Sequence, residues 1–265
     1  MDCVGSLMII LSKRLQCIAE QLLPGSRVAD IGSDHALLPV YLLQRGIAVE
    51  AVAGELTAGP LAAAQRGVRD AGLQAKIQVR QGNGLAVIEA GEVDAITIAG
   101  MGGALIRDIL EAGRLQGKLS FVRQLVLQPN IGEDAVRRWL REHGWQLAGE
   151  RIVEEDGKIY EVLNAYSASG PAVGDAYAAE RFAVLGDGRV SDERLLQMGP
   201  YLMLEGSPTW RKKWELELRK MERISQQMSA SELESARSRR EALEREMEEI
   251  KEVLLCTHMD RPSSD

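Results

Sequence analysis

The chain has 265 residues, 45% of them hydrophobic, and its 32 Lys and Arg against 39 Asp and Glu give a net charge of −7. This apolar content excludes an intrinsically disordered chain, and the length predicts one large domain with an appendage or two modest domains. The acidic balance and the few aromatic residues (4 Trp, 5 Tyr and 2 Phe) argue against an RNA-binding sheet that stacks bases, although a local basic face stays open.

Cysteine and hydropathy patterns narrow the class further. Cys3, Cys17 and Cys256 have no C-x-x-C spacing, which excludes a disulfide scaffold and a zinc ribbon, and the three histidines are too scattered to suggest a metal site. No apolar run approaches the ~20 residues of a membrane-spanning helix, and residues 7–11 lack the basic leader and cleavage site of a signal peptide. We therefore expect a cytoplasmic protein with no membrane partner.

Residues 1–166 alternate short apolar runs with amphipathic helical patterns. Strands are predicted at residues 27–31, 49–54, 76–80, 94–99 and 124–127. The helices that follow these strands are predicted to end near residue 44 and to span residues 61–71, 103–113 and 132–143. Such alternation, with glycines at the strand ends, predicts an α/β fold whose parallel sheet is covered on both faces. Two further strands at 145–154 and 158–166 flank Asp156-Gly157, a hairpin signal, so an antiparallel hairpin is expected to end the sheet.

The composition changes after this domain. Residues 167–206 are rich in Gly, Ala, Ser and Asp and are expected to be a connector, with a short helix near residues 177–183. Residues 207–265 are expected to form a helical hairpin, because Ser207-Pro208 is a helix start and Ser231-Glu-Leu-Glu234 has the spacing of a capping box. The second helix carries a heptad seam at Leu233, Ala236, Arg240, Leu243, Met247, Ile250 and Leu254. The hairpin either packs on its own domain or acts as an arm that contacts a partner or RNA.

Polar residues follow three successive strands in an order that suggests one ligand. Asp30-Ile-Gly32 ends the first strand, but no second glycine follows in G-x-G-x-x-G spacing, so a dinucleotide is disfavoured. Asp30 and Asp34 suit a cationic ammonium group, and Glu55 suits two ribose hydroxyls. Asn83 suits an exocyclic adenine amine. Each residue alone has an ordinary explanation in a turn or a helix start, but together they describe S-adenosylmethionine.

The fourth and fifth strands end at the same edge of the predicted sheet. Residues 99–103 (AGMGG) offer backbone carbonyls and the flexible wall of Met101, and they lack the Lys-Ser/Thr of a phosphate-binding P-loop. After the fifth strand, Gln128-Pro-Asn130 adds amide groups at this edge, although Asn130 would equally suit a cap of the following helix.

The sequence resembles the bacterial tRNA (adenine-22)-N1-methyltransferase family over essentially its whole length. The matching stretches are residues 11–15 (LSKRL), 29–36 (ADIGSDHA), 53–55 (AGE), 79–82 (VRQG), 94–105 (DAITIAGMGGAL), 127–131 (LQPNI), 154–158 (EEDGK) and 160–161 (YE). The resemblance implies a Rossmann-like class I methyltransferase domain followed by a coiled-coil-like C-terminal domain. It also implies methyl transfer from S-adenosylmethionine to N1 of one adenine of tRNA, with no metal. Asn83 stands where the family more usually has Asp, which is expected to weaken cofactor binding rather than abolish activity.

These inferences assign roles to two sets of residues. The cofactor is expected to contact the strand ends at Asp30, Gly32, Ser33, Asp34, His35, Glu55, Leu56, Gly82, Asn83, Gly84, Ala99, Gly100 and Met101. Methyl transfer is expected to involve Asp34, His35, Gly100, Met101 and Asn130, with backbone carbonyls near Gly100 and Met101 receiving the adenine amino group. His35 also suits a purely structural role at a helix start.

The partner is expected to be tRNA, and we expect a monomer. Basic residues that could contact its phosphates are Lys13, Arg14, Arg107, Arg114, Lys118, Arg137, Arg138, Arg141, Arg211, Lys212, Lys213, Arg237, Arg239 and Arg240. Two alternatives stay open: a methyltransferase acting on a small molecule or protein, and a degenerate methyltransferase fold that serves as a binding scaffold.

Overall fold

The structure is a computed structural model that describes residues 8–185, 190–228 and 234–257. The chain divides into two compact units, Met1–Asp175 and Ala176–Asp265. Among the described residues, no helix has the length and apolar character needed to cross a membrane.

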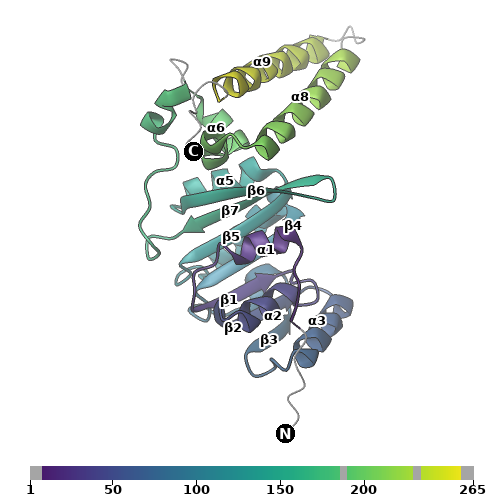
Figure 1. Cartoon of the computed structure of the whole chain (residues 1–265), viewed down its shortest axis with the longest axis vertical. Coiled ribbons are helices and arrows are strands. Elements are labelled where there is room, and N and C mark those ends of the chain that lie inside the picture. Colours follow the sequence, from purple (N-terminus) through teal and green to yellow (C-terminus); the bar gives the residue numbers. More distant parts are fainter. Residues whose placement is uncertain (1–7, 186–189, 229–233, 258–265) are drawn as a thin grey trace, which may run out of the picture. The chain divides into compact units, whose positions relative to one another are not determined.

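The first unit is built on a seven-stranded sheet with the order β3-β2-β1-β4-β5-β7-β6 (Figure 1). The strands are β1 (Ser26–Ile31), β2 (Ala48–Glu55), β3 (Ile77–Gln81), β4 (Ala95–Gly102), β5 (Gln124–Ile131), β6 (Gln146–Glu155) and β7 (Lys158–Tyr166). Strands β1 to β5 pair in parallel, whereas β7 pairs antiparallel with both β5 and β6. The predicted α/β fold with a final antiparallel hairpin is confirmed.

Helices cover both faces of this sheet. Helices α1 (Lys13–Ala19), α2 (Leu37–Gln44) and α3 (Ala58–Asp70) pack on the face that carries Val28 and Ala95. Helices α4 (Gly103–Leu115) and α5 (Glu133–Glu142) contact β4 and β5, whose alternate residues, such as Ile98 and Leu127, are also fully buried. The short 3-10 helix η1 (Gly84–Val87) follows β3. The sequence pattern did not predict α1, although Ser12 supplies its N-cap by accepting the Leu15 N–H at 3.3 Å.

The β6–β7 hairpin turns as its sequence predicts. Asp156 and Gly157 have φ values of +50° and +73°, the left-handed pair that a two-residue hairpin turn with the right-handed strand twist requires. The turn sets the register in which Glu155 pairs with Lys158.

Arg137 of α5 is fully buried and cannot contact RNA phosphates, contrary to its inclusion among the candidates. Its guanidinium forms ion pairs with Glu150 of β6, at 2.6 Å, and with Glu161 of β7, and both carboxylates are also fully buried. The helical spacing of the basic residues at 137, 138 and 141 gave no sign that one of them points into the core. A buried cation between two carboxylates joins α5 to the hairpin.

The second unit is helical and starts earlier than the sequence suggested. Its elements are the 3-10 helix η2 (Ala179–Leu185), α6 (Asp192–Met198), α7 (Pro200–Glu205), α8 (Pro208–Met228) and α9 (Glu234–Cys256). The expected connector at residues 167–206 is therefore wrong in its second half, because Leu196, Met198 and Met203 are buried there. The fully buried Trp210 joins α8 to the end of α6, because its indole N–H donates to the Met198 carbonyl at 2.9 Å.

Helices α8 and α9 form an antiparallel pair and lie side by side in Figure 1. The Arg211 guanidinium donates to the Leu254 carbonyl at 3.0 Å, and the Ser225 hydroxyl donates to Glu244 at 3.1 Å, so the start of α8 meets the end of α9. Three residues of the predicted seam are buried, namely Met247, Ile250 and Leu254, and Val253 joins them. Ser231 and Leu233 and the side chain of Ala236 lie outside the described residues.

Candidate active site

The carboxyl ends of β1, β2 and β4 bring the predicted polar residues to one edge of the sheet. Asp30 is paired in register with Ala53 of β2 and Thr97 of β4, and the residue is only 4% exposed. One carboxylate oxygen accepts the Ser33 hydroxyl at 2.6 Å and the other accepts the Thr97 hydroxyl at 2.6 Å. Asp30 therefore ties the loop after β1 to β4, and its expected contact with an ammonium group stays a prediction.

Burial raises the pKa of Asp30, while the hydroxyls of Ser33 and Thr97 and the positive charge of Arg14 act in the opposite direction. Arg14 of α1 is thus within electrostatic reach of the buried carboxylate, although it lies on an element that the sequence analysis did not place at this edge.

The loop after β1 has an unusual backbone. Gly32, Asp34, His35 and Ala36 have φ values of +70°, +40°, +66° and +58°, so three consecutive residues with side chains adopt the left-handed conformation. Such residues cost about 1–3 kcal/mol each and persist only where the surrounding structure holds them. The Gly32 and Ser33 N–H groups hold this loop by donating to the Gly54 carbonyl of β2 at 2.9 and 3.3 Å.

The loop also lies very close to the end of β4. A Cβ atom added to Gly32 would lie 2.4 Å from the Met101 methyl carbon, so the Met101 side chain would have to move, and the φ of +70° favours glycine at this position. The side chains of Asp34 and His35 are largely exposed, at 85% and 60%, with 3.6 Å between the Asp34 carboxylate and the His35 imidazole. Asp34 and His35 therefore lie on the solvent-exposed side of the site and not in its buried part.

Glu55 ends β2 and is the clearest unsatisfied group of the site. It is 6% exposed and accepts a hydrogen bond from the Asp34 backbone, but its Oε1 atom is buried and has no hydrogen-bond partner among the described residues. Burial, together with the negative charges of Asp30 and Asp34, raises the pKa of Glu55. A buried acceptor without a partner costs about 1–3 kcal/mol, so this oxygen fits a ligand that brings hydroxyl donors.

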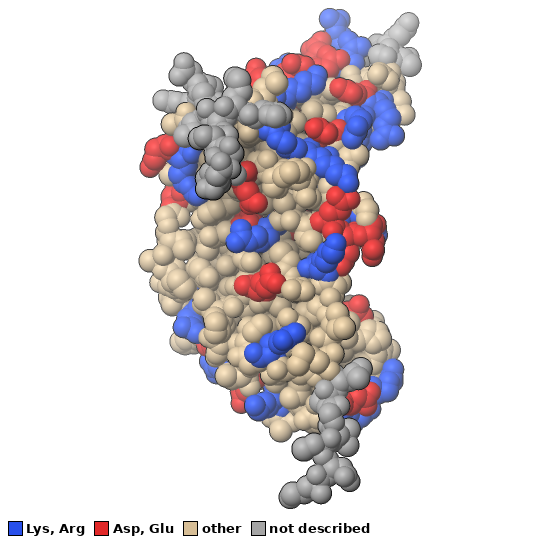
Figure 2. All heavy atoms as spheres, in the orientation of Figure 1, with Lys and Arg blue, Asp and Glu red and all other residues tan. Residues whose placement is uncertain are grey.

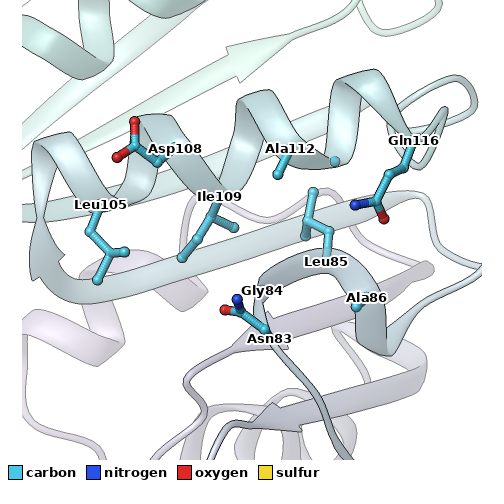
Figure 3. A pocket seen from close by; sticks show the side chains of 10 residues that line it. Asn83, Gly84, Leu85, Ala86, Leu105, Asp108, Ile109, Ala112 and Gln116 are labelled. Atoms are coloured by element: carbon cyan, nitrogen blue, oxygen red, sulfur yellow. The ribbon is translucent and has the colours of Figure 1, made fainter.

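A cavity of about 140 Å³ lies beside Asn83, between η1 and α4 (Figure 3). Leu85, Leu105 and Ile109 give it apolar walls, and Asn83 and Asp108 supply polar groups at its border. It is too small for a whole cofactor but has the chemistry to take one planar heterocycle, with apolar faces and a polar edge. The expected position of an adenine beside Asn83 is consistent with this cavity and stays a prediction.

The ends of β4 and β5 are joined by side-chain amides. The Gly100 N–H donates to the Gln128 side-chain oxygen at 3.1 Å, and the Asn130 amide donates to the Gly100 carbonyl at 2.8 Å. Asn130 does not cap α5, whose N-cap is Gly132. Gly100 has a φ of +76°, and the two amides hold this left-handed turn in place. Its carbonyl already has one partner, so an adenine amino group would have to use the second lone pair.

Sequence reasoning expected the Gln128 amide at this edge but missed Thr97 and Tyr160 as parts of the site, and it named Arg14 only as a candidate for RNA phosphates. The Arg14 guanidinium donates to the Gln128 oxygen at 2.6 Å and lies over the Tyr160 ring, 5.5 Å from its centroid. The stretches 11–15 and 154–161 were signals in the family resemblance, but only the fold shows that they meet at this edge.

Several of the basic residues proposed to contact RNA form ion pairs with neighbouring carboxylates. Arg107 pairs with Asp108 at 2.8 Å, Arg114 with Glu111 at 2.7 Å, and Lys118 with Glu89 at 2.9 Å. In the second unit, Figure 2 shows Lys and Arg side chains interspersed with Asp and Glu over α8 and α9 rather than gathered in a separate patch. Ion pairs such as Arg237–Glu241, at 3.2 Å, account for part of this mixture.

The strand order of the sheet and the similarity to solved structures define the class as a Rossmann-like methyltransferase. The family model described as tRNA (adenine(22)-N(1))-methyltransferase matches residues 28–252, and the chain belongs to this family. A curated relative, the tRNA (adenine(22)-N(1))-methyltransferase of Bacillus subtilis, is 46% identical over 245 residues, covering 92% of this chain and 97% of the relative.

Solved structures agree over the same span. The crystal structure of the B. subtilis M1A22 tRNA methyltransferase TrmK has a TM-score of 0.80 at 45% identity, covering 93% of this chain and 99% of that chain. A Streptococcus pneumoniae structure in complex with S-adenosyl-L-methionine has a TM-score of 0.75 at 39% identity, covering 92% of this chain and 100% of that chain. The family expected from the sequence motifs is thereby confirmed.

Proposed function

We propose that this protein transfers a methyl group from S-adenosylmethionine to N1 of adenine 22 of tRNA. The observation that carries the proposal is the order of polar groups along one sheet edge, from Asp30 through Glu55 to Asn83, with the buried Oε1 atom of Glu55 lacking a partner among the described residues. Family membership and the S. pneumoniae complex with this cofactor support it.

The cofactor would be held by residues from three strand ends. Asp34, with Asp30 behind it, would face the ammonium group, Glu55 would accept the two ribose hydroxyls, and Asn83 would accept the adenine amine. The remaining expected contacts come from the loops around these residues: Gly32, Ser33, His35, Leu56, Gly82, Gly84, Ala99, Gly100 and Met101. When bound, the cofactor supplies an electrophilic methyl group on a sulfonium ion.

The protein's part in the reaction is chiefly positioning. Adenine N1 carries an in-plane lone pair, so the residues need not remove a proton from it before the methyl group is attacked. Alignment alone can supply effective molarities of ~10⁵ M or more. The turn at Gly100, held by Gln128 and Asn130, gives the β4 end a fixed shape against which the base can be oriented. The target adenine must first leave its stack in the folded RNA to reach this edge.

Asp34 is also proposed to act on the charge that moves during methyl transfer. The positive charge moves from sulfur to the methylated base during the reaction, and the exposed carboxylate of Asp34 would stabilise it. Asp34→Ala is expected to lower turnover. Unchanged turnover with normal cofactor affinity would remove Asp34 from the catalytic residues. His35 and Met101 are proposed to line the same side of the opening.

We also propose that residues 1–166 form the cofactor-binding domain and that the helices within 207–265 form a coiled-coil-like arm that contacts tRNA. Monomeric action in the cytoplasm fits this assignment.

A methylation assay tests the function directly. Transcribed tRNA with adenine at position 22 is expected to accept one labelled methyl group, and the same tRNA with guanine at that position is expected to accept none. Titration calorimetry with S-adenosylmethionine separates the two alternatives. A degenerate scaffold would not bind the cofactor, whereas an enzyme with a small-molecule or protein substrate would bind it and leave both tRNAs unmethylated.

A further inference from the structure

Two stretches that belong to the family resemblance, residues 11–15 and 154–161, have no role in holding the cofactor at β1 to β3. The structure brings them together at the start of α1. The Lys13 N–H donates to the Glu155 carboxylate of β6 at 2.6 Å, and the Arg14 guanidinium lies over the Tyr160 ring of β7. The beginning of α1 is therefore attached to the antiparallel hairpin in a defined position.

Arg14 differs from Arg107 and Arg114 in the chemistry of its partners. Its side-chain hydrogen bond goes to a neutral amide, the Gln128 oxygen at 2.6 Å, and no carboxylate lies within ion-pair distance of it among the described residues. Arg107 and Arg114, by contrast, each hold an Asp or Glu. Arg14 is also half-buried, so its charge is less well solvated than that of an exposed side chain. A guanidinium in this state has unused donors suited to an oxyanion.

The position of Arg14 indicates which oxyanion it takes. Gln128 and Tyr160 lie on β5 and β7, whereas Asp30 and Glu55 lie on β1 and β2, and β4 separates the two groups in the strand order. The Gly100 turn stands at the end of β4, and a Cβ atom added there would lie 3.7 Å from the Arg14 guanidinium. The proposed ammonium and ribose contacts follow β1 and β2, whereas Arg14 contacts residues of β5 and β7, although its charge still acts on Asp30. The side of the turn that carries Arg14 is therefore the one left for a substrate.

We propose that Arg14 binds a phosphate of the substrate RNA next to the target nucleotide, with Tyr160 and Gln128 fixing the plane of its guanidinium. The proposal rests on the proposed function, since it requires an RNA substrate. The contact with the Tyr160 ring and the hydrogen bond to Gln128 leave further N–H groups of the guanidinium to donate. Arg14 is then a positioning residue that sets the register of the nucleotide against the Gly100 turn.

The test compares Arg14→Gln with Arg66→Gln in the full-length protein. Arg66 is exposed on α3, so the control removes the same charge at a different place. We measure tRNA binding at several salt concentrations, the KM and kcat for tRNA, and the Kd of S-adenosylmethionine by calorimetry. Loss of a charge-assisted contact is expected to weaken tRNA binding about 10- to 100-fold in Arg14→Gln. The slope of log affinity against log salt should fall by about one phosphate, roughly 0.7–0.9.

A second variant, Arg14→Lys, keeps the charge but loses the planar fork, so it is expected to bind tRNA more weakly while keeping the salt slope. This variant keeps the test decisive should Arg14→Gln fail to fold, as judged by thermal unfolding. The proposal is overturned if Arg14→Gln keeps the wild-type salt slope, or if it weakens cofactor binding and leaves tRNA binding unchanged. The latter result would assign the oxyanion to the cofactor's carboxylate. Absence of tRNA binding by the wild-type protein would instead overturn the proposed function, before any variant is compared.

Discussion

Glu55→Gln is expected to weaken cofactor binding without weakening the fold. Glu55 is almost fully buried, and only one of its two oxygens is known to be occupied, by the Asp34 backbone. The amide keeps one acceptor oxygen and replaces the other with a donor, so one charge-assisted hydrogen bond to a ribose hydroxyl is lost. Such a bond contributes about 1.5–3 kcal/mol, which corresponds to a rise in Kd of about 10- to 100-fold.

The free energy of unfolding of Glu55→Gln, by contrast, should not fall and is expected to rise. Because burial raises the pKa of Glu55, the ionised carboxylate destabilises the folded protein at neutral pH, and a neutral amide removes that cost. The folded wild-type protein takes up a proton more readily than the unfolded chain, so its penalty disappears as the pH falls through the raised pKa and below the ordinary value of 4.5. Glu55→Gln should therefore equal or exceed the wild type in stability at pH 7, and the difference should shrink in acid.

The assay is calorimetric titration with S-adenosylmethionine, paired with urea unfolding at pH 7 and at pH 4. Glu50→Gln is the matched control, because Glu50 lies on the same strand but is exposed at its other end. Wild-type affinity in Glu55→Gln, or an equal loss in Glu50→Gln, would refute the reasoning. Cofactor affinity of the wild type should also fall as acid protonates Glu55.

Three further outcomes are expected. Gly32→Ala should weaken cofactor binding, measured by calorimetry, because the φ of +70° strains alanine and its Cβ would displace the Met101 methyl, 2.4 Å away; unchanged affinity would contradict this role of Gly32. Arg137→Met should lower the free energy of unfolding in urea by about 3–5 kcal/mol, because it leaves the carboxylates of Glu150 and Glu161 buried without their cation. Arg237→Met, which breaks an exposed ion pair with Glu241, should cause a much smaller loss. Deleting residues 176–265 should weaken tRNA binding in a filter assay more than cofactor binding. If the shortened protein bound tRNA as tightly as the full chain, the proposal that the helical arm contacts tRNA would be wrong.

The sheet could be predicted because its signal is local. Buried parallel strands are short apolar runs between helical patterns, and Asp156-Gly157 permits one tight turn. The same logic placed Asp30 and Glu55 at one edge, since the carboxyl ends of parallel strands coincide there. The connector was mistaken because its Gly and Ala content resembles a linker. The apolar residues of α6 and α7 are too few to give a clear helical period in segments of 7 and 6 residues.

Other features depend on contacts between distant segments and had no local signal. Arg137 looks like any basic residue on a helix until β6 and β7 place carboxylates against it. Arg14 and Tyr160 are separated by most of the first unit and meet only because β7 inserts between β5 and β6. The left-handed run from Asp34 to Ala36 follows directly on Gly32 and Ser33, whose N–H groups donate to Gly54 of the neighbouring strand, and no pattern of residue types predicts these contacts.

The same contacts explain how the edge can be ready for a ligand. The loop after β1 and the turn at Gly100 both adopt left-handed backbone, and each is held from a neighbouring strand, by Gly54 and Thr97 in one case and by Gln128 in the other. The free energy that holds these turns comes from the sheet and is available before any ligand arrives, so binding need not order them. Glu55 is the exception, because its buried Oε1 atom has no hydrogen-bond partner among the described residues and would gain one only from a ligand. A site arranged in this way gains affinity from one buried oxygen while its backbone stays fixed, which is the combination that an in-line transfer between two bound molecules requires.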